Sequence, residues 1–245
     1  MTNSLQTEQP AFDHLLHWVP DVDAAVAAYT AAGMPAHANP PDTGFQHGGW
    51  RMDERYVEIL TVTDEERFRA HMFAQAWTAL EPAAAVASRA GGGAMTFAVN
   101  VTDVGETAAR LLRAGHKILD TVIPRESTGG SIGFREVFLL DAPSWAPFFI
   151  TYDPPREVFL AQIPAGAFPS GDFTMTEIVI ETPDPARSAA WLAAVIGLPV
   201  HDAVLDLPGG AVRFVPGPAD RIIEAVLSGP RPLDVTPAGL RWHTQ

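Results

Sequence analysis

Two polar side chains stand out because they lie inside apolar, strand-like runs of the sequence. His14 lies near the start of the segment 12–33, and Glu58 lies in the run 55–62. An unpaired carboxylate in such surroundings costs several kcal/mol, so Glu58 needs a metal, an arginine or histidine, or the solvent of an open cleft as its partner. An imidazole and a carboxylate can exchange protons with a ligand or bind a divalent metal. His14 could equally be a core histidine that is hydrogen-bonded to the backbone.

Four further residues are candidates for substrate contact. His47 stands among glycines, which allow another backbone to approach closely, and Trp50 follows it by three residues. Tyr56 shares the strand-like run of Glu58. Arg135 is central in another such run, where its guanidinium could bind a substrate carboxylate or pair with a neighbouring acid. We expect these four residues to bind the substrate, although a tryptophan in this position is also a common core residue.

A threefold repeat predicts how these residues are positioned. The segments 12–33, 94–115 and 175–197 each contain an apolar strand-like run, an aspartate, an alanine-rich stretch and a glycine. The aspartates (Asp21, Asp103 and Asp184) are suited to cap a helix N-terminus, and the glycines to end the helix. Strand-like runs follow each helix, which predicts an α+β fold built from β-α-β-β-β modules at 11–62, 94–153 and 174–228.

The remaining segments are predicted to connect these modules. Residues 63–93 should be helical around 65–88, with a break near Pro82, and should join the first two modules into one domain over 11–155. The proline-rich segment 156–173 is expected to be a linker, and 229–245 to be a tail.

Composition limits the classes of protein that fit. The 245 residues are 47% hydrophobic and 18% charged, as in a globular protein with a real core. The net charge of −13 disfavours nucleic acid as a partner. The absence of cysteine excludes disulfides, a thiol nucleophile and thiolate metal sites. Met1–Pro10 is polar and lacks the apolar region of a signal peptide. The sequence contains no apolar run long enough to span a membrane. A cytoplasmic location is therefore expected.

The modules resemble those of the vicinal oxygen chelate superfamily, which includes glyoxalase I, extradiol dioxygenases and bleomycin-resistance proteins. More narrowly, the chain resembles glyoxalase-like domain proteins. The resemblance is carried by Phe12-Asp13-His14, Pro20-Asp21-Val22-Asp23, Tyr56-Val57-Glu58-Ile59-Leu60, Leu111-Leu112-Arg113-Ala114-Gly115 and Ala146-Pro147-Phe148-Phe149-Ile150. It implies that paired modules form a half-open mixed-sheet barrel, with a degenerate third module. It also implies that a divalent metal is held by the first and last strands of each module.

In the first module this resemblance implies His14 and Glu58 as metal ligands. The matching second-module positions are Thr96 and a residue near Thr151 (Phe149 is the other candidate), and none of these is a good ligand. A site with ligands from both modules is therefore not supported.

Two other arrangements would restore a metal site. His47 could complete a set with His14 and Glu58, or the third module could face the first and supply Glu177 and Glu224. The cofactor would then be Zn, Mn, Fe, Ni or Co. Without either set of ligands, no metal cofactor is expected.

Two functions fit these observations. The first is an enzyme that acts on a small oxygenated metabolite by isomerase or lyase chemistry, with Glu58 or His14 moving the proton. The alternative is a metal-free protein that binds or sequesters a small drug-like molecule, for which the acidic balance suggests a cationic aromatic ligand. The odd number of modules predicts that the third one pairs across a homodimer or caps the barrel edge.

Overall fold

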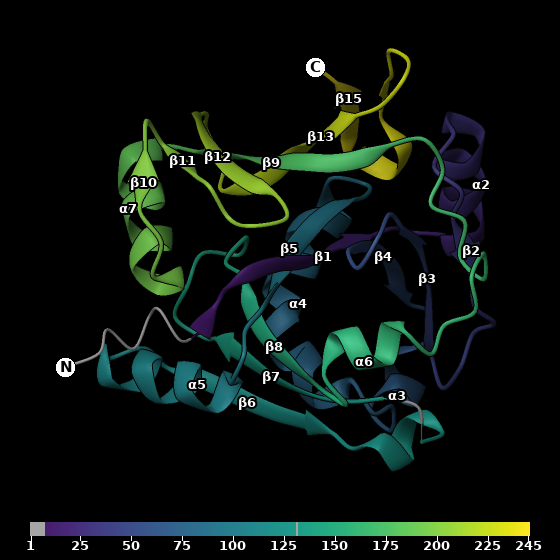
Figure 1. Cartoon of the computed structure of the whole chain (residues 1–245), viewed down its shortest axis with the longest axis horizontal. Helices are drawn as coiled ribbons and strands as arrows, with labels where there is room; N and C mark the ends of the chain where they lie inside the picture. The colour runs from purple at the N-terminus through teal and green to yellow at the C-terminus, as the bar shows by residue number, and fades with distance from the viewer. Residues whose placement is uncertain (1–7, 131) are drawn as a thin grey trace.

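The computed structural model describes residues 8–130 and 132–245. Residues 1–7 lie outside this range, and so does most of the polar stretch 1–10, in which no signal peptide is expected. The chain forms two mixed sheets, one of eight strands and one of seven, which lie one above the other in Figure 1. None of the helices within the described ranges is long and apolar enough to cross a membrane.

The first sheet contains the first two modules, each with the predicted β-α-β-β-β order. Its elements are β1 (Ala11–Trp18), α2 (Val22–Ala32), β2 (His37–Ala38), β3 (Phe45–Arg51), β4 (Tyr56–Val62), β5 (Gly93–Asn100), α5 (Val104–Arg113), β6 (Ile118–Ile123), β7 (Gly133–Leu139) and β8 (Phe148–Asp153). The strand order is β2-β3-β4-β1-β5-β8-β7-β6. Antiparallel pairing of β1 with β5 joins the modules, and the first and last strands of each module pair in parallel.

Local capping explains where the module helices begin. The Asp21 carboxylate accepts a hydrogen bond from the Ala24 N–H at 2.9 Å, and Asp103 and Asp184 cap α5 and α7 in the same way. Gly33 ends α2 with a φ of +92°, a left-handed conformation that glycine adopts without a steric penalty. The strand–helix units therefore form at the positions predicted from the sequence.

The second sheet contains the third module and more. Its elements are β9 (Thr174–Thr182), α7 (Pro185–Ile196), β10 (Val200–His201), β11 (Val204–Leu205), β12 (Ala211–Pro216), β13 (Arg221–Ser228), β14 (Asp234–Val235) and β15 (Arg241–Thr244). β12 pairs in parallel with β9, as β4 does with β1, so β12 is the last strand of the third module. β13 pairs antiparallel with β9, as β5 does with β1.

This pairing corrects two expectations. β13, β14 and β15 form a shortened fourth module without the module helix, so the segment 229–245 belongs to the sheet and is not a free tail. The third module therefore has its partner within the same chain. The physical reason is that β13 satisfies the free edge of β9, which would otherwise expose unpaired backbone groups.

One hydrophobic core holds the two sheets together. It combines Phe12, Leu15 and Phe97 of the first sheet with Ile178 and Phe214 of the second. The opposite face of the first sheet is covered by other elements. These are α3 (Glu65–Phe68), α4 (Ala74–Arg89) and α6 (Arg156–Leu160).

Both connecting segments differ from their predictions. α4 runs through Pro82 without the expected break, and Ala83, Ala84 and Ala87 stay buried along it. We attribute the unbroken helix to this packing. The segment expected to be a linker contains α6, which crosses in front of the first sheet in Figure 1.

Candidate functional site

A cavity of about 290 Å³ lies between the open face of the first sheet and helices α4 and α6. Most of its wall is aromatic or aliphatic, with Phe45, Phe73, Trp77, Phe134, Phe138 and Phe148 among the lining residues. The polar side chains His14, His47, Glu58 and Glu136 also line it. Such a cavity suits a largely apolar small molecule that carries a few polar atoms.

His14 lies on the central strand β1, where its side chain is almost fully buried. Its ring stacks on Tyr56 with a centroid separation of 4.4 Å and meets the edge of Phe148 at 5.5 Å. The pairing register of β1 with β5 shifts between Phe12 and His14, so Asp13 is an extra residue in β1. Phe12 consequently packs in the core between the sheets, while His14 faces the cavity, and simple alternation along the strand does not hold here.

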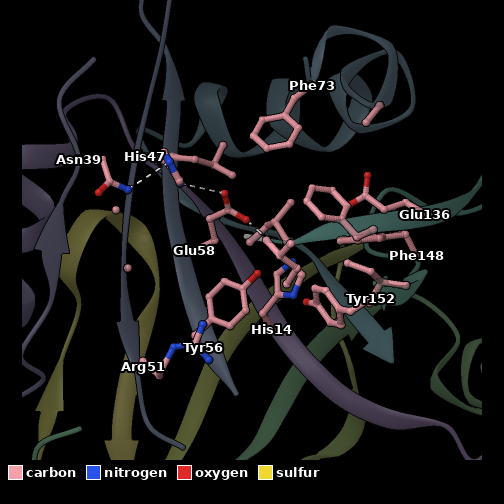
Figure 2. Close-up of a pocket in the computed structure, with 18 of the residues that line it drawn as sticks. His14, Asn39, His47, Arg51, Tyr56, Glu58, Phe73, Glu136, Phe148 and Tyr152 are labelled. Carbon is pink, nitrogen blue, oxygen red and sulfur yellow. Dashed lines mark hydrogen bonds and ion pairs between the residues drawn. The ribbon is translucent and has the colours of Figure 1, made fainter. Parts of the chain in front are cut away.

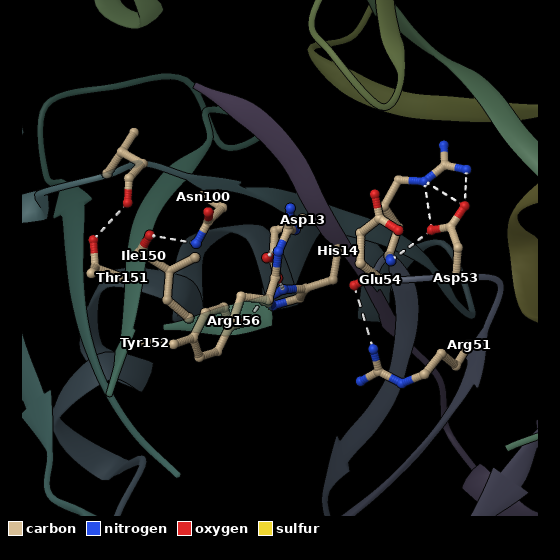
Figure 3. Close-up of polar contacts among 12 residues, drawn as sticks. Asp13, His14, Arg51, Asp53, Glu54, Asn100, Ile150, Thr151, Tyr152 and Arg156 are labelled. Carbon is tan, nitrogen blue, oxygen red and sulfur yellow. Dashed lines mark hydrogen bonds and ion pairs between the residues drawn. The ribbon is translucent and has the colours of Figure 1, made fainter. Parts of the chain in front are cut away.

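Asp13 holds His14 in place from within the protein. Its carboxylate is fully buried and lies 2.6 Å from His14 Nδ1. It also accepts hydrogen bonds from the Tyr152 hydroxyl at 2.7 Å and from Arg156 Nη1 at 2.8 Å (Figure 3). Burial raises the pKa of Asp13, but the bonds and charges of these three partners outweigh it and hold the pKa below its usual value. His14 Nε2 is thereby directed away from Asp13, toward Glu58.

Glu58 lies between two imidazoles, as Figure 2 shows. Its Oε1 is 3.3 Å from His47 Nδ1, and its Oε2 is 3.9 Å from His14 Nε2. Burial raises the pKa of Glu58, but the hydrogen bond and charge of His47 and the charge of His14 outweigh it and keep the carboxylate ionised. Burial likewise lowers the pKa of His47, whereas Glu58 raises it more strongly. Asn39 Nδ2 contacts the other ring nitrogen of His47 at 3.1 Å.

The other three predicted substrate contacts are placed differently. Tyr56 lines the cavity beside His14, with the Arg51 guanidinium 4.7 Å above its ring. Trp50 borders the cavity, but its side chain is fully buried in the core and its indole N–H donates to the Ser170 carbonyl at 2.7 Å. Arg135 is not among the residues that line the cavity. Its Nε donates to Asp120 Oδ1 at 2.8 Å on an exposed surface, which is the ion pair considered as the alternative.

Sequence reasoning missed Glu136, a second carboxyl group in the cavity. It lies on β7 and is 8% exposed. Burial and the nearby charge of Glu58 raise its pKa to about 8, although a hydrogen bond from Thr121 acts in the opposite direction. Its pairing with Ile150 on β8 places it in the second module where His47 lies in the first, because His47 pairs with Leu60 on β4. The available signal was a glutamate placed between Phe134 and Phe138 on one face of the predicted strand.

The second module supplies no metal ligand at the matching positions. Leu16 pairs with Glu58 in the first module and Ala98 pairs with Phe148 in the second, so the counterpart of Glu58 is Phe148. This corrects the expected Thr151 or Phe149, because the register was uncertain by a residue or two. The Thr96 hydroxyl, at the counterpart of His14, donates to the Ala146 carbonyl.

The alternative metal set from the third module is also wrong. Glu177 lies in the second sheet and accepts a hydrogen bond from Arg213 Nε at 2.8 Å. Glu224 lies in the same sheet, 2.9 Å from Arg241 Nη1 and 3.1 Å from His243 Nε2. Among the described residues, no three His, Asp or Glu side chains are arranged to hold a metal ion. The predicted set of His14, His47 and Glu58 is brought together, with Glu58 3.3 Å from His47 and 3.9 Å from His14, but it is not in such an arrangement.

Paired β-α-β-β-β modules with a cavity on the concave face of their joint sheet define the vicinal oxygen chelate fold. The sequence matches the glyoxalase-like domain family over residues 12–196, and the chain belongs to that family. No curated protein matches it.

Solved structures share the fold at low sequence identity. A hypothetical protein from Staphylococcus aureus has a TM-score of 0.75 and 12% identity, covering 96% of this chain and 98% of that one. BphC, a halotolerant catechol dioxygenase, has a TM-score of 0.60 and 11% identity, with coverage of 97% and 86%. A variant of 4-hydroxymandelate synthase from Streptomyces coelicolor has a TM-score of 0.56 and 12% identity, with coverage of 90% and 71%. At these identities the likeness concerns the fold alone.

Proposed function

We propose that the protein is an enzyme that moves a proton on a small oxygenated molecule, in the manner of an isomerase or lyase. The observation that carries this proposal is the ionised Glu58 carboxylate facing an apolar cavity with an imidazole on either side. A carboxylate that is kept ionised and partly shielded from water is suited to accept a proton from a bound carbon acid. We assign Glu58 as the base.

The two histidines have different roles in this proposal. His14 is fixed by Asp13 through Nδ1 and presents Nε2 toward Glu58, so it can hold the substrate oxygen or pass a proton back. His47 pairs with Glu58 at 3.3 Å and holds the carboxylate in position. No step is assigned to a metal, because the side chains present do not form a site for one.

Exchange of hydrogen for deuterium tests the assignment without knowledge of the natural substrate. Aromatic ketones and 2-oxo acids are incubated with the protein in deuterated buffer, and loss of their α-proton signals is followed by NMR. We expect exchange with the wild type and a rate at least about 100-fold lower in Glu58→Gln, since a general base typically contributes this much. Glu65→Gln, which changes an exposed carboxylate on α3, should exchange as the wild type does.

Three outcomes would contradict this assignment. Equal rates in the wild type and Glu58→Gln would remove Glu58 as the base. Loss of exchange after treatment with a chelator would place a metal in the mechanism. Binding of the compounds without any exchange would favour the second candidate function.

That second candidate is a metal-free binding protein for a small drug-like molecule. The aromatic lining of the cavity favours it, because such a wall binds apolar rings without needing chemistry. For either function we propose a cytoplasmic protein that acts on a small molecule, without nucleic acid or membrane as a partner. We also propose a homodimer, formed by a contact other than pairing of the third module, which has its partner within the same chain. Light scattering would decide it.

A further inference from the structure

Glu136 is a polar residue of the cavity to which the proposed reaction assigns no role. It belongs to the part of the cavity wall formed by the second module, and Figure 2 shows it beside Phe148 and across the cavity from His47. His47 and Glu136 occupy matching positions on the third strands of their modules. The approximate symmetry of the fold therefore places one polar group on each side of the ligand space.

The hydrogen-bonding capacity of Glu136 is largely free. Within the described part of the chain its one side-chain hydrogen bond comes from the Thr121 hydroxyl, at a long 3.4 Å. The wall beside it is formed by Phe134, Phe138 and Phe148. A buried carboxyl group in such surroundings keeps its proton, and burial together with the Glu58 charge raises its pKa to about 8. At neutral pH the group is then an O–H donor.

The charged groups around Glu136 favour its protonated form. Glu58 faces it from β4 and disfavours a second negative charge. On β6, Asp120 is engaged by Arg135. α4 contributes the apolar Trp77 and Leu80 to the cavity wall. Arg156 also lines the cavity, but it is engaged by Asp13. A second negative charge in the same cavity as Glu58 would therefore be costly.

We infer that Glu136 donates a hydrogen bond to an uncharged oxygen of the substrate, and that the substrate is an aromatic or otherwise apolar carbonyl compound. This inference rests on the proposed function. The C–H bond next to the carbonyl breaks and its proton passes to the Glu58 carboxylate. The electron pair forms a C=C bond, and the carbonyl oxygen takes the negative charge. That oxygen is stabilised by the Glu136 O–H, and return of the proton to carbon completes the isomerisation.

Three matched probes test the ligand class. Acetophenone carries a neutral carbonyl, benzoate a carboxylate and benzylamine an ammonium group, each on the same ring. Binding is measured by NMR titration at neutral pH with wild type, Glu136→Gln and Glu136→Leu. We expect acetophenone to bind most tightly. Glu136→Gln, which keeps a neutral donor, should stay within about threefold, whereas Glu136→Leu should weaken binding by about tenfold, the effect of one lost hydrogen bond.

The protonation state is tested without any ligand. The side-chain carboxyl carbon of Glu136, assigned by its absence from the spectrum of Glu136→Gln, is titrated by NMR. A midpoint well above that of an ordinary glutamate supports the inference, and a carboxylate ionised at neutral pH overturns it. Preferential binding of benzylamine that is lost in Glu136→Gln would also overturn it, and would indicate a cationic ligand.

The two proposals can fail separately. If Glu58→Gln abolishes exchange while folded Glu136→Leu binds acetophenone as the wild type does, the inference on Glu136 is wrong and the base assignment stands. If acetophenone binding depends on Glu136 but no exchange occurs, the ligand class stands and the enzymatic function is wrong.

Discussion

At the residue scale, Asp13 connects the candidate site to the segment that covers it. The same carboxylate contacts His14, which faces the cavity, and Arg156, which begins α6. A buried carboxylate that satisfies an arginine and an imidazole together is strongly favoured over one that satisfies either alone. The position of α6 over the cavity and the orientation of His14 are therefore linked through one side chain.

His17 gives a prediction for the pH dependence of stability. It is fully buried, with Nδ1 2.7 Å from the Tyr29 hydroxyl and Nε2 3.0 Å from the Ala238 carbonyl. Burial lowers its pKa to about 4, although the Ala238 contact raises it. The unfolded chain therefore binds a proton that the folded protein does not. The contribution of His17 to the free energy of unfolding should be fully present above about pH 6.5. It should decrease toward pH 4, by at most about 1.4 kcal/mol per pH unit.

Urea unfolding at several pH values measures this effect. His17→Gln keeps a donor and an acceptor but cannot titrate, so its stability should lose this part of the slope between pH 6.5 and 4. An unchanged slope would mean that other groups control the acid sensitivity.

At the scale of elements, strand β3 depends on its glycines. His47 reaches the cavity from β3, and Gly48 and Gly49 follow it in the strand. A Cβ atom on Gly48 would lie 2.1 Å from the His37 carbonyl oxygen, and one on Gly49 would lie 2.6 Å from the Val57 carbonyl oxygen. Both contacts are with backbone, which cannot rotate away. The glycines thus let β2 and β4 approach β3 closely enough to hold His47 next to Glu58.

Gly48→Ala should therefore destabilise the protein by about 1–3 kcal/mol, the usual cost of overpacking, and displace His47. Urea unfolding measures the first effect, and the His47 imidazole signals in NMR report the second. Gly210→Ala is the matched control, because its added Cβ would meet only the Phe12 ring at an ordinary 3.4 Å. Equal stability of the two variants would show that the strands can separate at little cost.

At the scale of the whole molecule, the two sheets share one architecture but differ in their site positions. In the second sheet Glu177 matches His14, and Arg213 matches Glu58 because it pairs with Val179 as Glu58 pairs with Leu16. These two residues form an ion pair in which Arg213 Nη2 lies 2.7 Å from Glu177 Oε2. Because Arg213 stands at the position of Glu58, Glu177 has an oppositely charged partner within its own sheet. The second sheet thus supports the first through the shared core.

The C-terminal strand tests this support. Trp242 on β15 is fully buried and packs its ring against Tyr29 and Trp50 of the first module, at centroid distances of 5.5 and 5.8 Å. Trp242→Ala should lower the free energy of unfolding by about 3–5 kcal/mol, as expected for a large core truncation. It should do so in a single transition, because both sheets share the core.

Val122→Ala is the control, since Val122 is 62% exposed and its truncation should change stability by less than about 0.5 kcal/mol. Circular dichroism during urea unfolding follows both variants. Two separate transitions in Trp242→Ala would show that the sheets fold independently.

The sequence by itself determined the modules and part of the site. Aspartate caps and terminal glycines act within a few residues, so each strand–helix unit could be predicted without knowledge of the rest of the chain. The expectation that His14 and Glu58 meet followed from the resemblance to the vicinal oxygen chelate superfamily, which implies a site on the first and last strands of a module. That the carboxylate needs a partner followed from the cost of burying it, and the structure supplies His47 and His14.

Only the tertiary structure decided how the distant segments come together. The extra residue at Asp13 depends on the register between β1 and β5, which lie far apart in sequence. The place of Glu136 in the cavity depends on β7 pairing with β8. The fourth, helix-free module depends on β13 pairing with β9. Such pairings are fixed by side-chain packing across the sheets, and a one-residue change in register reverses which side chains face the cavity.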